Sequence, residues 1–126
     1  MNYIFVMAGG ALGSAARYFV GQQAGRLLGT GWPYGTFAVN LIGGLAMGAL
    51  VAMLALRGGA DQDRWRALLG VGVLGGFTTF SAFSLESALM IERKDYGLAI
   101  LYVVASATLS IAAVFAGMFM TRKVLA

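Results

Sequence analysis

The sequence contains no cysteine and no histidine, and only 11% of its 126 residues are charged. The absence of these two side chains excludes disulfides, thiol catalysis and imidazole metal sites. The acidic residues are Asp61, Asp63, Glu86, Glu92 and Asp95. No two of them lie together inside an apolar stretch, so we expect no hydrolytic carboxylate pair and predict that the chain is not an enzyme.

Apolar side chains are abundant instead. They make up 60% of the residues, and the mean hydropathy is +0.81, whereas about 25% of a soluble domain is charged. So small a chain cannot hide these side chains from water, which makes lipid the expected solvent. The net charge of +4 comes from basic residues at the ends of apolar runs, which is typical of a membrane surface rather than of a nucleic-acid site. The N-terminus has no basic region, so we expect no cleavable signal.

Four stretches reach the roughly 20 residues that a spanning helix needs: residues 3–28, 33–56, 65–91 and 96–120. Short linkers at residues 29–32, 57–64 and 92–95 join them, and Pro33 suits the first turn of the second helix. We therefore predict an all-α membrane protein, with residues 1–126 forming a single four-helix transmembrane domain. An even number of spans puts both termini on one side.

The basic residues are almost evenly divided between the two sides. The predicted topology puts Arg57, Arg64, Arg66, Arg122 and Lys123 on one side, and on or nearest the other Arg17, Arg26, Arg93 and Lys94. Five against four gives little orienting bias. Two interpretations stay open: the chain inserts both ways and pairs as an antiparallel dimer, or loop details fix one orientation.

Many of the 19 glycines lie four residues apart. The pairs are Gly9 and Gly13, Gly21 and Gly25, Gly44 and Gly48, and Gly72 and Gly76. Small residues at this spacing let helices approach closely in lipid. The pattern predicts tight helix packing without indicating a function.

Asn40 lies seven residues after Pro33, roughly 10 Å into the bilayer at 1.5 Å per residue. Thr36 is one turn earlier on the same face. Polar groups at this depth are costly and therefore mark candidate functional sites. The alternative for Asn40 is a hydrogen bond between helices.

The third apolar stretch contains the sequence GGFTTFSAFS at residues 75–84. Two glycines followed by β-branched threonines weaken a helix. A break within the membrane is tolerated where the freed backbone is buried in protein or lines a wet cavity, and freed carbonyls or N–H groups can then bind ions. The alternative is an unbroken helix whose glycines pack against a neighbour.

Several side chains in the second half of the chain have anion-compatible groups. The ring edges of Phe80 and Phe83 are partially positive, although paired phenylalanines are usually core residues. Ser81 and Ser84 repeat the same three-residue spacing. Hydroxyls at four-residue spacing follow one face of the fourth helix, at Tyr102, Ser106 and Ser110.

Arg17 lies inside the first apolar stretch. It either extends to the near surface or draws anions into a vestibule. Glu86 and Ser87, near the end of the third helix, are candidate partners for it. The sequence leaves these alternatives open.

Taken together, these segments resemble the Fluc family of fluoride channels, also called CrcB proteins. The resemblance covers essentially the whole chain. It rests on residues 9–13 (GGALG) with Arg17 and Tyr18, on residues 35–43 (GTFAVNLIG), and on residues 75–83 (GGFTTFSAF) with Ser84 and Glu86. One departure is Ala82, where the family often has threonine, so one hydroxyl is missing from the expected pore.

The resemblance implies a fluoride channel that exports cytoplasmic fluoride across the bacterial plasma (inner) membrane. It further implies an antiparallel, dual-topology homodimer with two pores at the interface and a break in helix three. The implied pore residues are Thr36, Asn40, Phe80, Ser81, Phe83, Ser84, Tyr102, Ser106 and Ser110, with Arg17 in a vestibule. A structural sodium ion is implied at the dimer centre, held by main-chain carbonyls of Gly75 and Thr78.

Two other classes of membrane protein compete with this interpretation. Small multidrug-resistance transporters are also short four-helix chains, but they use a glutamate in the first helix. The first helix here has no acidic residue and carries Arg17, which argues against cation export. A non-transporting assembly subunit needs only packing, which leaves Asn40 and the 75–84 stretch unexplained.

Overall fold

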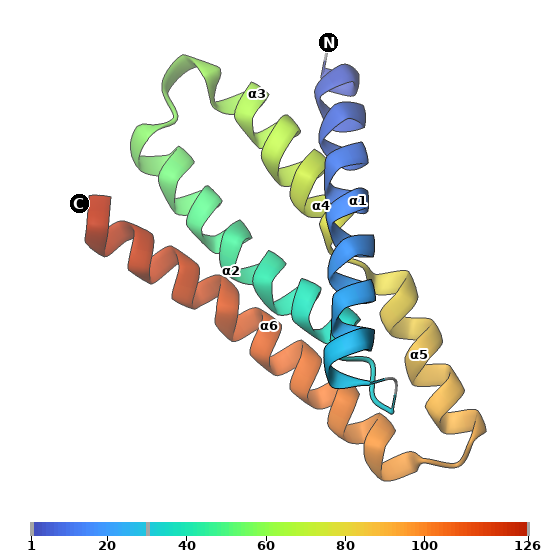
Figure 1. Cartoon of the computed structure of the whole chain (residues 1–126). Helices are drawn as coiled ribbons and strands as arrows, with labels where there is room; N and C mark the ends of the chain where they lie inside the picture. Colours follow the sequence, from blue (N-terminus) through green and yellow to red (C-terminus); the bar gives the residue numbers. More distant parts are fainter. Residues whose placement is uncertain (1, 30, 126) are drawn as a thin grey trace.

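The computed structural model describes residues 2–29 and 31–125. It has four helical segments that are long and apolar enough to cross a membrane: Asn2–Leu28, Tyr34–Arg57, Gly59–Glu92 and Tyr96–Leu125. The first and third run in one direction and the second and fourth in the other, so both termini lie at the same end (Figure 1). The predicted all-helical, four-span, multi-pass membrane protein is confirmed.

The first two spans are regular helices, α1 (Asn2–Leu28) and α2 (Tyr34–Arg57). α1 is followed by Gly29, whose φ of +86° suits glycine. Pro33 lies one residue before α2 rather than inside its first turn, and its carbonyl accepts a hydrogen bond from the Phe37 N–H at 3.1 Å. The proline therefore caps the helix from just outside.

The third span is made of five short pieces in series. They are η1 (Gly59–Asp61, a 3₁₀ turn), α3 (Gln62–Trp65), η2 (Arg66–Leu74, with π-helical hydrogen bonding), α4 (Gly75–Phe77) and α5 (Phe80–Glu92). The predicted polar loop at residues 57–64 is thus mostly helical. Two ion pairs with i,i+3 spacing, Asp61 with Arg64 and Asp63 with Arg66, support these turns.

Two glycine-rich crossings hold the spans together. A Cβ at Gly9 or Gly13 of α1 would overlap backbone of η2, and one at Gly48 of α2 would overlap the Val114 carbonyl of α6 (Tyr96–Leu125). α2 and α6 lie side by side along most of their length (Figure 1). Three of the four predicted glycine pairs therefore lie at helix contacts.

The pair Gly21 and Gly25 differs from the others, although the Gly21 backbone lies against Gly35 of α2. A Cβ at either position would meet open space. The spacing alone could not show this difference, because it reports a helix face and not what covers that face.

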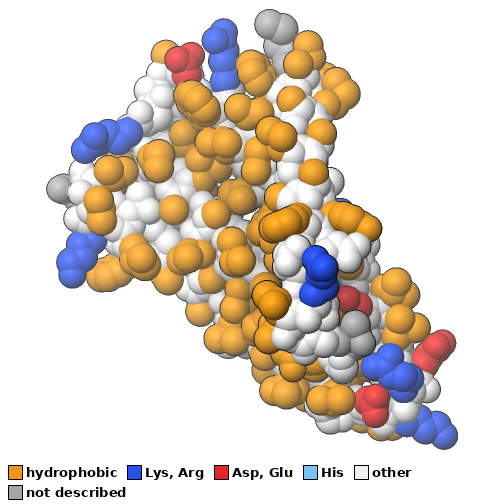
Figure 2. All heavy atoms as spheres, in the orientation of Figure 1, with side chains coloured by type: hydrophobic (Ala, Val, Ile, Leu, Met, Phe, Trp, Pro, Cys, Tyr) orange, Lys and Arg blue, Asp and Glu red, His pale blue; other side chains and the backbone are white. Residues whose placement is uncertain are grey.

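Little of the single chain is buried. The small core contains Met90, Ala99 and Tyr102, with Trp32 and Phe83 packed against it. Apolar side chains cover most of the surface, and charged ones gather mostly toward the two ends (Figure 2). This distribution suits a chain surrounded by lipid.

Candidate functional site

The helical hydrogen bonding of the third span is interrupted between α4 and α5. Thr78 (φ −86°, ψ 161°) and Thr79 (φ −153°, ψ 122°) have extended backbone, and helix resumes at Phe80. The Thr79 hydroxyl accepts a hydrogen bond from the Ala82 N–H at 3.1 Å. Threonine in this position caps a helix N-terminus, so Thr79 sets where α5 begins.

Asn40 of α2 holds this extended segment through both ends of its amide. Its Nδ2 donates to the Thr79 carbonyl at 3.2 Å, and its Oδ1 accepts from the Thr79 N–H at 3.0 Å. The amide thus takes the place of a backbone partner. The sequence left open whether Asn40 forms a hydrogen bond between helices. It does, and its partners are backbone atoms of Thr79.

These side-chain bonds release two carbonyls from helical pairing. In a continuous helix the Gly75 carbonyl would accept from Thr79 N–H, and the Thr78 carbonyl from Ala82 N–H. Both N–H groups donate to side chains instead. The two carbonyls that the family resemblance implies for a cation therefore lack their helical donors. Carbonyl oxygen is a hard ligand that suits such an ion.

Arg17 of α1 reaches the same segment. Its Nε donates to the Gly76 carbonyl at 3.1 Å, and the side chain is partly buried. A cation at the end of α4 faces carbonyls that point along the helix axis, where positive charge is stabilising. Neither candidate is its partner in the described residues, because Glu86 accepts from the Tyr102 hydroxyl and the Ser87 hydroxyl donates to the Phe83 carbonyl at 2.8 Å.

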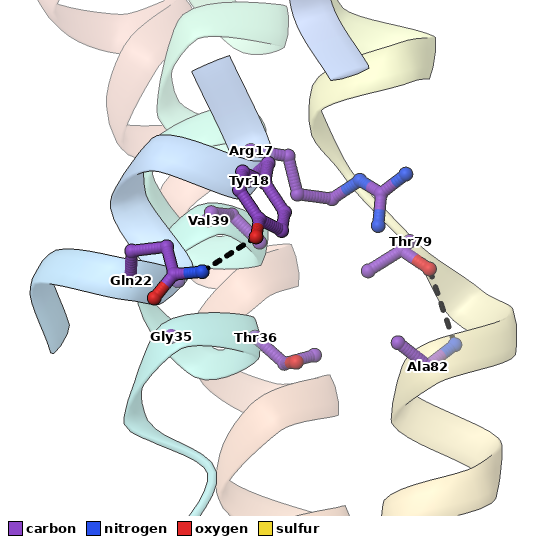
Figure 3. A pocket seen from close by; sticks show the side chains of 9 residues that line it. Arg17, Tyr18, Gln22, Gly35, Thr36, Val39, Thr79 and Ala82 are labelled. Carbon is purple, nitrogen blue, oxygen red and sulfur yellow. Dashed lines mark hydrogen bonds between the residues drawn. The ribbon is translucent and has the colours of Figure 1, made fainter. Parts of the chain in front are cut away.

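Arg17 also lines a cavity of about 360 Å³ between α1, α2 and α5. Figure 3 shows Thr36, Thr79 and Ala82 facing the same space, with Tyr18 and Gln22 hydrogen-bonded at its edge. Ala82 thus lies in this cavity, where a threonine would add a hydroxyl. Arg17, predicted to lie in a vestibule, and Thr36, predicted to line the pore, therefore line the same cavity.

A second cavity, of about 310 Å³, gathers most of the other predicted pore residues. Its lining includes Asn40, Phe80, Phe83, Ser106 and Ser110, with Thr78, Thr79 and Ala107. The two phenyl rings are 5.7 Å apart between centroids and tilted by 43°. The cavity therefore combines aromatic rings, an amide and hydroxyls on one side of the extended segment.

The two serine hydroxyls in this cavity are free to bind an occupant. The oxygens of Ser106 and Ser110 are buried and make no hydrogen bond within residues 2–29 and 31–125. Serines in helices commonly bond back to their own carbonyls, and these two do not. A buried hydroxyl without a partner costs about 1–3 kcal/mol, so a polar occupant of the cavity would be stabilised.

Tyr102 is fully buried behind this cavity. Its hydroxyl donates to Glu86 Oε1 at 3.0 Å, and its ring lies 5.1 Å from that of Phe83. The pairing with Glu86 had no sequence signal, because the two residues are 16 positions apart on different helices. Tyr102 thus supports Phe83 from behind rather than lining the cavity.

Ser81 and Ser84 line neither cavity. Both are exposed on the first turns of α5, and the Ser81 hydroxyl lies 3.3 Å from that of Thr79. Thr79 itself was missed as a site residue, although a threonine directly before a helix is a recognisable capping signal.

Most of the sequence matches a known family. A family model described as CrcB-like protein, Camphor Resistance (CrcB), matches residues 4–118. The chain belongs to the CrcB family. The expected membership is thereby confirmed.

Curated members of the CrcB family resemble the chain over nearly its full length. A "Fluoride-specific ion channel FluC" of Caulobacter sp. (strain K31) is 66% identical over 121 residues, covering 96% of this chain and 94% of the relative. A protein of the same name from Phenylobacterium zucineum (strain HLK1) is 61% identical, with 98% and 97% covered. One from Rhodopseudomonas palustris (strain BisB5) is 48% identical, with 98% and 99% covered.

Proposed function

We propose that this CrcB-family protein is a fluoride-selective ion channel that exports cytoplasmic fluoride across the bacterial inner membrane. The observation that carries the proposal is the cavity lined by Asn40, Phe80, Phe83, Ser106 and Ser110, with its two unpartnered hydroxyls. The names of the relatives support the same ion. The lining offers hydrogen-bond donors and ring edges but no fixed charge.

This chemistry suits fluoride because the ion is small and strongly hydrated. A conduction path must replace part of its water without binding it too tightly. Hydroxyls donate hydrogen bonds, and a phenyl edge offers weak positive potential. A fixed cation such as lysine at the same place would hold the ion too strongly to release it. Arg17 lies in the neighbouring cavity, where it raises the local anion concentration.

The proposed assembly is an antiparallel, dual-topology homodimer with two pores at the subunit interface. Phe80 is 79% exposed in the single chain, and Ser81 and Ser84 are exposed beside it. A second copy against this face would enclose the ring and bring the two serines to the path. The five-to-four division of basic residues supports insertion in both orientations.

A structural sodium ion fits the same arrangement. The carbonyls of Gly75 and Thr78 would hold it, one pair from each subunit, since their helical N–H partners bond elsewhere. When bound, the ion supplies positive charge close to the anion paths in a low-dielectric site. The proposed site uses main-chain oxygens alone and needs no acidic side chain.

Fluoride efflux from liposomes tests the function directly. Vesicles loaded with potassium fluoride and containing the purified protein should release fluoride rapidly when valinomycin lets potassium leave. Vesicles loaded with chloride should release almost none. A coupled cation exchanger would require a proton or drug gradient, and a packing subunit would give no flux, so either result would reject the channel.

Single-cysteine labelling tests the topology. The chain has no native cysteine, so Gln62→Cys between the second and third spans reports one position only. In cells, an impermeant thiol reagent should label about half of the protein from outside, and the remainder should react after permeabilisation. Labelling from one side alone would reject dual topology and leave the channel function standing.

Sodium dependence is a separate test. The dimer should melt at a higher temperature in sodium chloride than in N-methylglucamine chloride of equal ionic strength, because only sodium can bind the carbonyls. Equal melting temperatures would reject the sodium site.

A further inference from the structure

A third cavity, of about 210 Å³, lies away from the extended segment, where the third span begins. It is lined by Phe5, Asp61, Arg64, Trp65 and Leu68. Phe5 comes from the first turns of α1, and the others from η1, α3 and the start of η2. These elements share one end of the molecule (Figure 1), where charged residues follow the apolar span. Charged residues at the end of a span lie near the membrane surface, so we expect the cavity at the level of lipid headgroups.

The polar side of this cavity offers one charge of each sign. The closest atoms of Arg64 and Asp61 are 3.8 Å apart, and their side chains are 69% and 66% exposed. Exposed pairs of this kind contribute roughly 0–1 kcal/mol, so little is lost when a ligand comes between them. The neighbouring pair Arg66 and Asp63 is closed at 3.0 Å and lies outside the cavity lining.

The remaining wall is apolar. Phe5 and Leu68 are half-buried, and Trp65 is 48% exposed. Tryptophan is enriched at membrane interfaces because its ring is apolar and its N–H is polar. The cavity thus runs from the exposed Arg64–Asp61 pair to an aromatic and aliphatic surface that suits an acyl chain.

We infer that this cavity binds a zwitterionic aminophospholipid, phosphatidylethanolamine. Arg64 donates to the phosphate oxygens, and the Asp61 carboxylate accepts from the primary ammonium. Phosphatidylglycerol carries the phosphate without a cation and would leave Asp61 facing an anion. Phosphatidylcholine carries a cation without N–H donors. The inference does not rest on the proposed fluoride conduction.

Trp65 provides the readout. The chain has two tryptophans, so Trp32→Phe leaves Trp65 as the sole fluorophore. The full-length variant is reconstituted in vesicles whose phosphatidylethanolamine, phosphatidylcholine or phosphatidylglycerol carries brominated acyl chains, at equal mole fractions. Brominated phosphatidylethanolamine should associate with the site about threefold more strongly, the factor that one exposed charged contact provides.

Three variants examine the charges. Asp61→Asn should abolish the preference for phosphatidylethanolamine over phosphatidylglycerol, and Arg64→Gln should weaken quenching by all three lipids. Asp63→Asn is the matched control, because it removes the same charge from the same segment outside the cavity. It should behave like the parent.

Native mass spectrometry of the unsubstituted chain gives a second measurement if Trp32→Phe does not fold. Phosphatidylethanolamine should remain bound to it at activation energies that strip phosphatidylglycerol, and Asp61→Asn should remove this difference. Three outcomes would overturn the inference. The first is equal quenching and equal retention of the three lipids. The second is protection of Trp65 from all of them, as when a second copy covers the cavity, and the third is an equal effect of Asp61→Asn and Asp63→Asn.

Discussion

Where α2 crosses α6, backbone lies directly against backbone, whereas at Thr78 and Thr79 the backbone is held by side chains. At the crossing, a Cβ on Gly117 would overlap the Leu45 carbonyl, and each helix keeps its own hydrogen bonds. At the threonines, Asn40 supplies the partners that the helix has lost. The first arrangement leaves the backbone hydrogen bonds of both helices intact, and the second leaves two backbone carbonyls without their helical donors.

The two regions are therefore expected to contribute differently, the glycine crossing to stability and the extended segment to ion binding. Packing between glycines depends on close van der Waals contact and gives stability. An interrupted helix in lipid is costly unless its polar groups are satisfied, and here they are satisfied unevenly. Substitutions in the two regions should therefore separate stability from conduction.

Gly117→Ala should have the largest effect on folding. The added methyl has no room against the Leu45 carbonyl, and such overpacking costs about 3 kcal/mol. Gly97→Ala in the same helix is the matched control, since its Cβ would meet open space. Thermal melting in detergent at equal protein concentration should show a large loss for the first variant only. Similar melting of the two would mean that α2 and α6 are not in close contact.

Asn40→Leu should be the next most severe change. It leaves the Thr79 N–H and carbonyl without their hydrogen-bond partner, which lowers the free energy of unfolding by about 2 kcal/mol or more. It also removes a donor from the cavity. Both the melting temperature and the fluoride flux should fall. Asn40→Asp keeps the acceptor for the Thr79 N–H and should recover part of the melting temperature. If Asn40→Leu melts like the parent, the amide does not hold the extended segment.

Phe80→Ile and Phe83→Ile should affect conduction more than folding. Phe80 is mostly exposed in the single chain, and a swap between apolar side chains costs under about 1.5 kcal/mol. The flux should fall at least about tenfold, which is 1.4 kcal/mol in barrier height, because an aliphatic side chain has no positive edge. Dimer formation by size-exclusion chromatography is the control. If both variants assemble as dimers and conduct like the parent, the two rings contribute only to packing and not to conduction.

Ser106→Ala should give the smallest change in stability. Its hydroxyl has no partner among the described residues, so removing it should shift the free energy of unfolding by less than about 1 kcal/mol in either direction. The flux should nevertheless fall by roughly threefold, because losing part of the energy of one hydrogen bond raises the conduction barrier by that factor. Ser14→Ala on the exposed side of α1 controls for a general serine effect. An unchanged flux would remove Ser106 from the path.

The four spans were predictable because their apolar runs are long and their linkers short. The ends of the helices were less predictable, since hydropathy indicates contact with lipid and not where a helix terminates. α6 continues to Leu125, past the predicted end at residue 120, because Arg122 and Lys123 are good helix formers that simply leave the lipid. The π-helical turns of η2 had no signal in the sequence.

Residue types at the candidate site were also predictable, but their partners were not. Asn40, Phe80, Phe83, Ser106 and Ser110 are polar or aromatic residues at regular positions in apolar helices, and the structure brings them to one cavity. The bonds from Arg17 to Gly76 and from Tyr102 to Glu86 join distant positions. Such pairings depend on how helices cross, which spacing along one helix does not determine.

The bond between Asn40 and Thr79 also has a meaning for the order of assembly. A ribosome makes α2 before the third span, so the amide of Asn40 is in the membrane before the backbone that needs it. When Thr78 and Thr79 leave water, their polar groups would otherwise cost several kcal/mol in hydrocarbon. The chain therefore supplies the partner 39 residues ahead of the segment that uses it, and the interrupted span can enter lipid beside a helix that is already there.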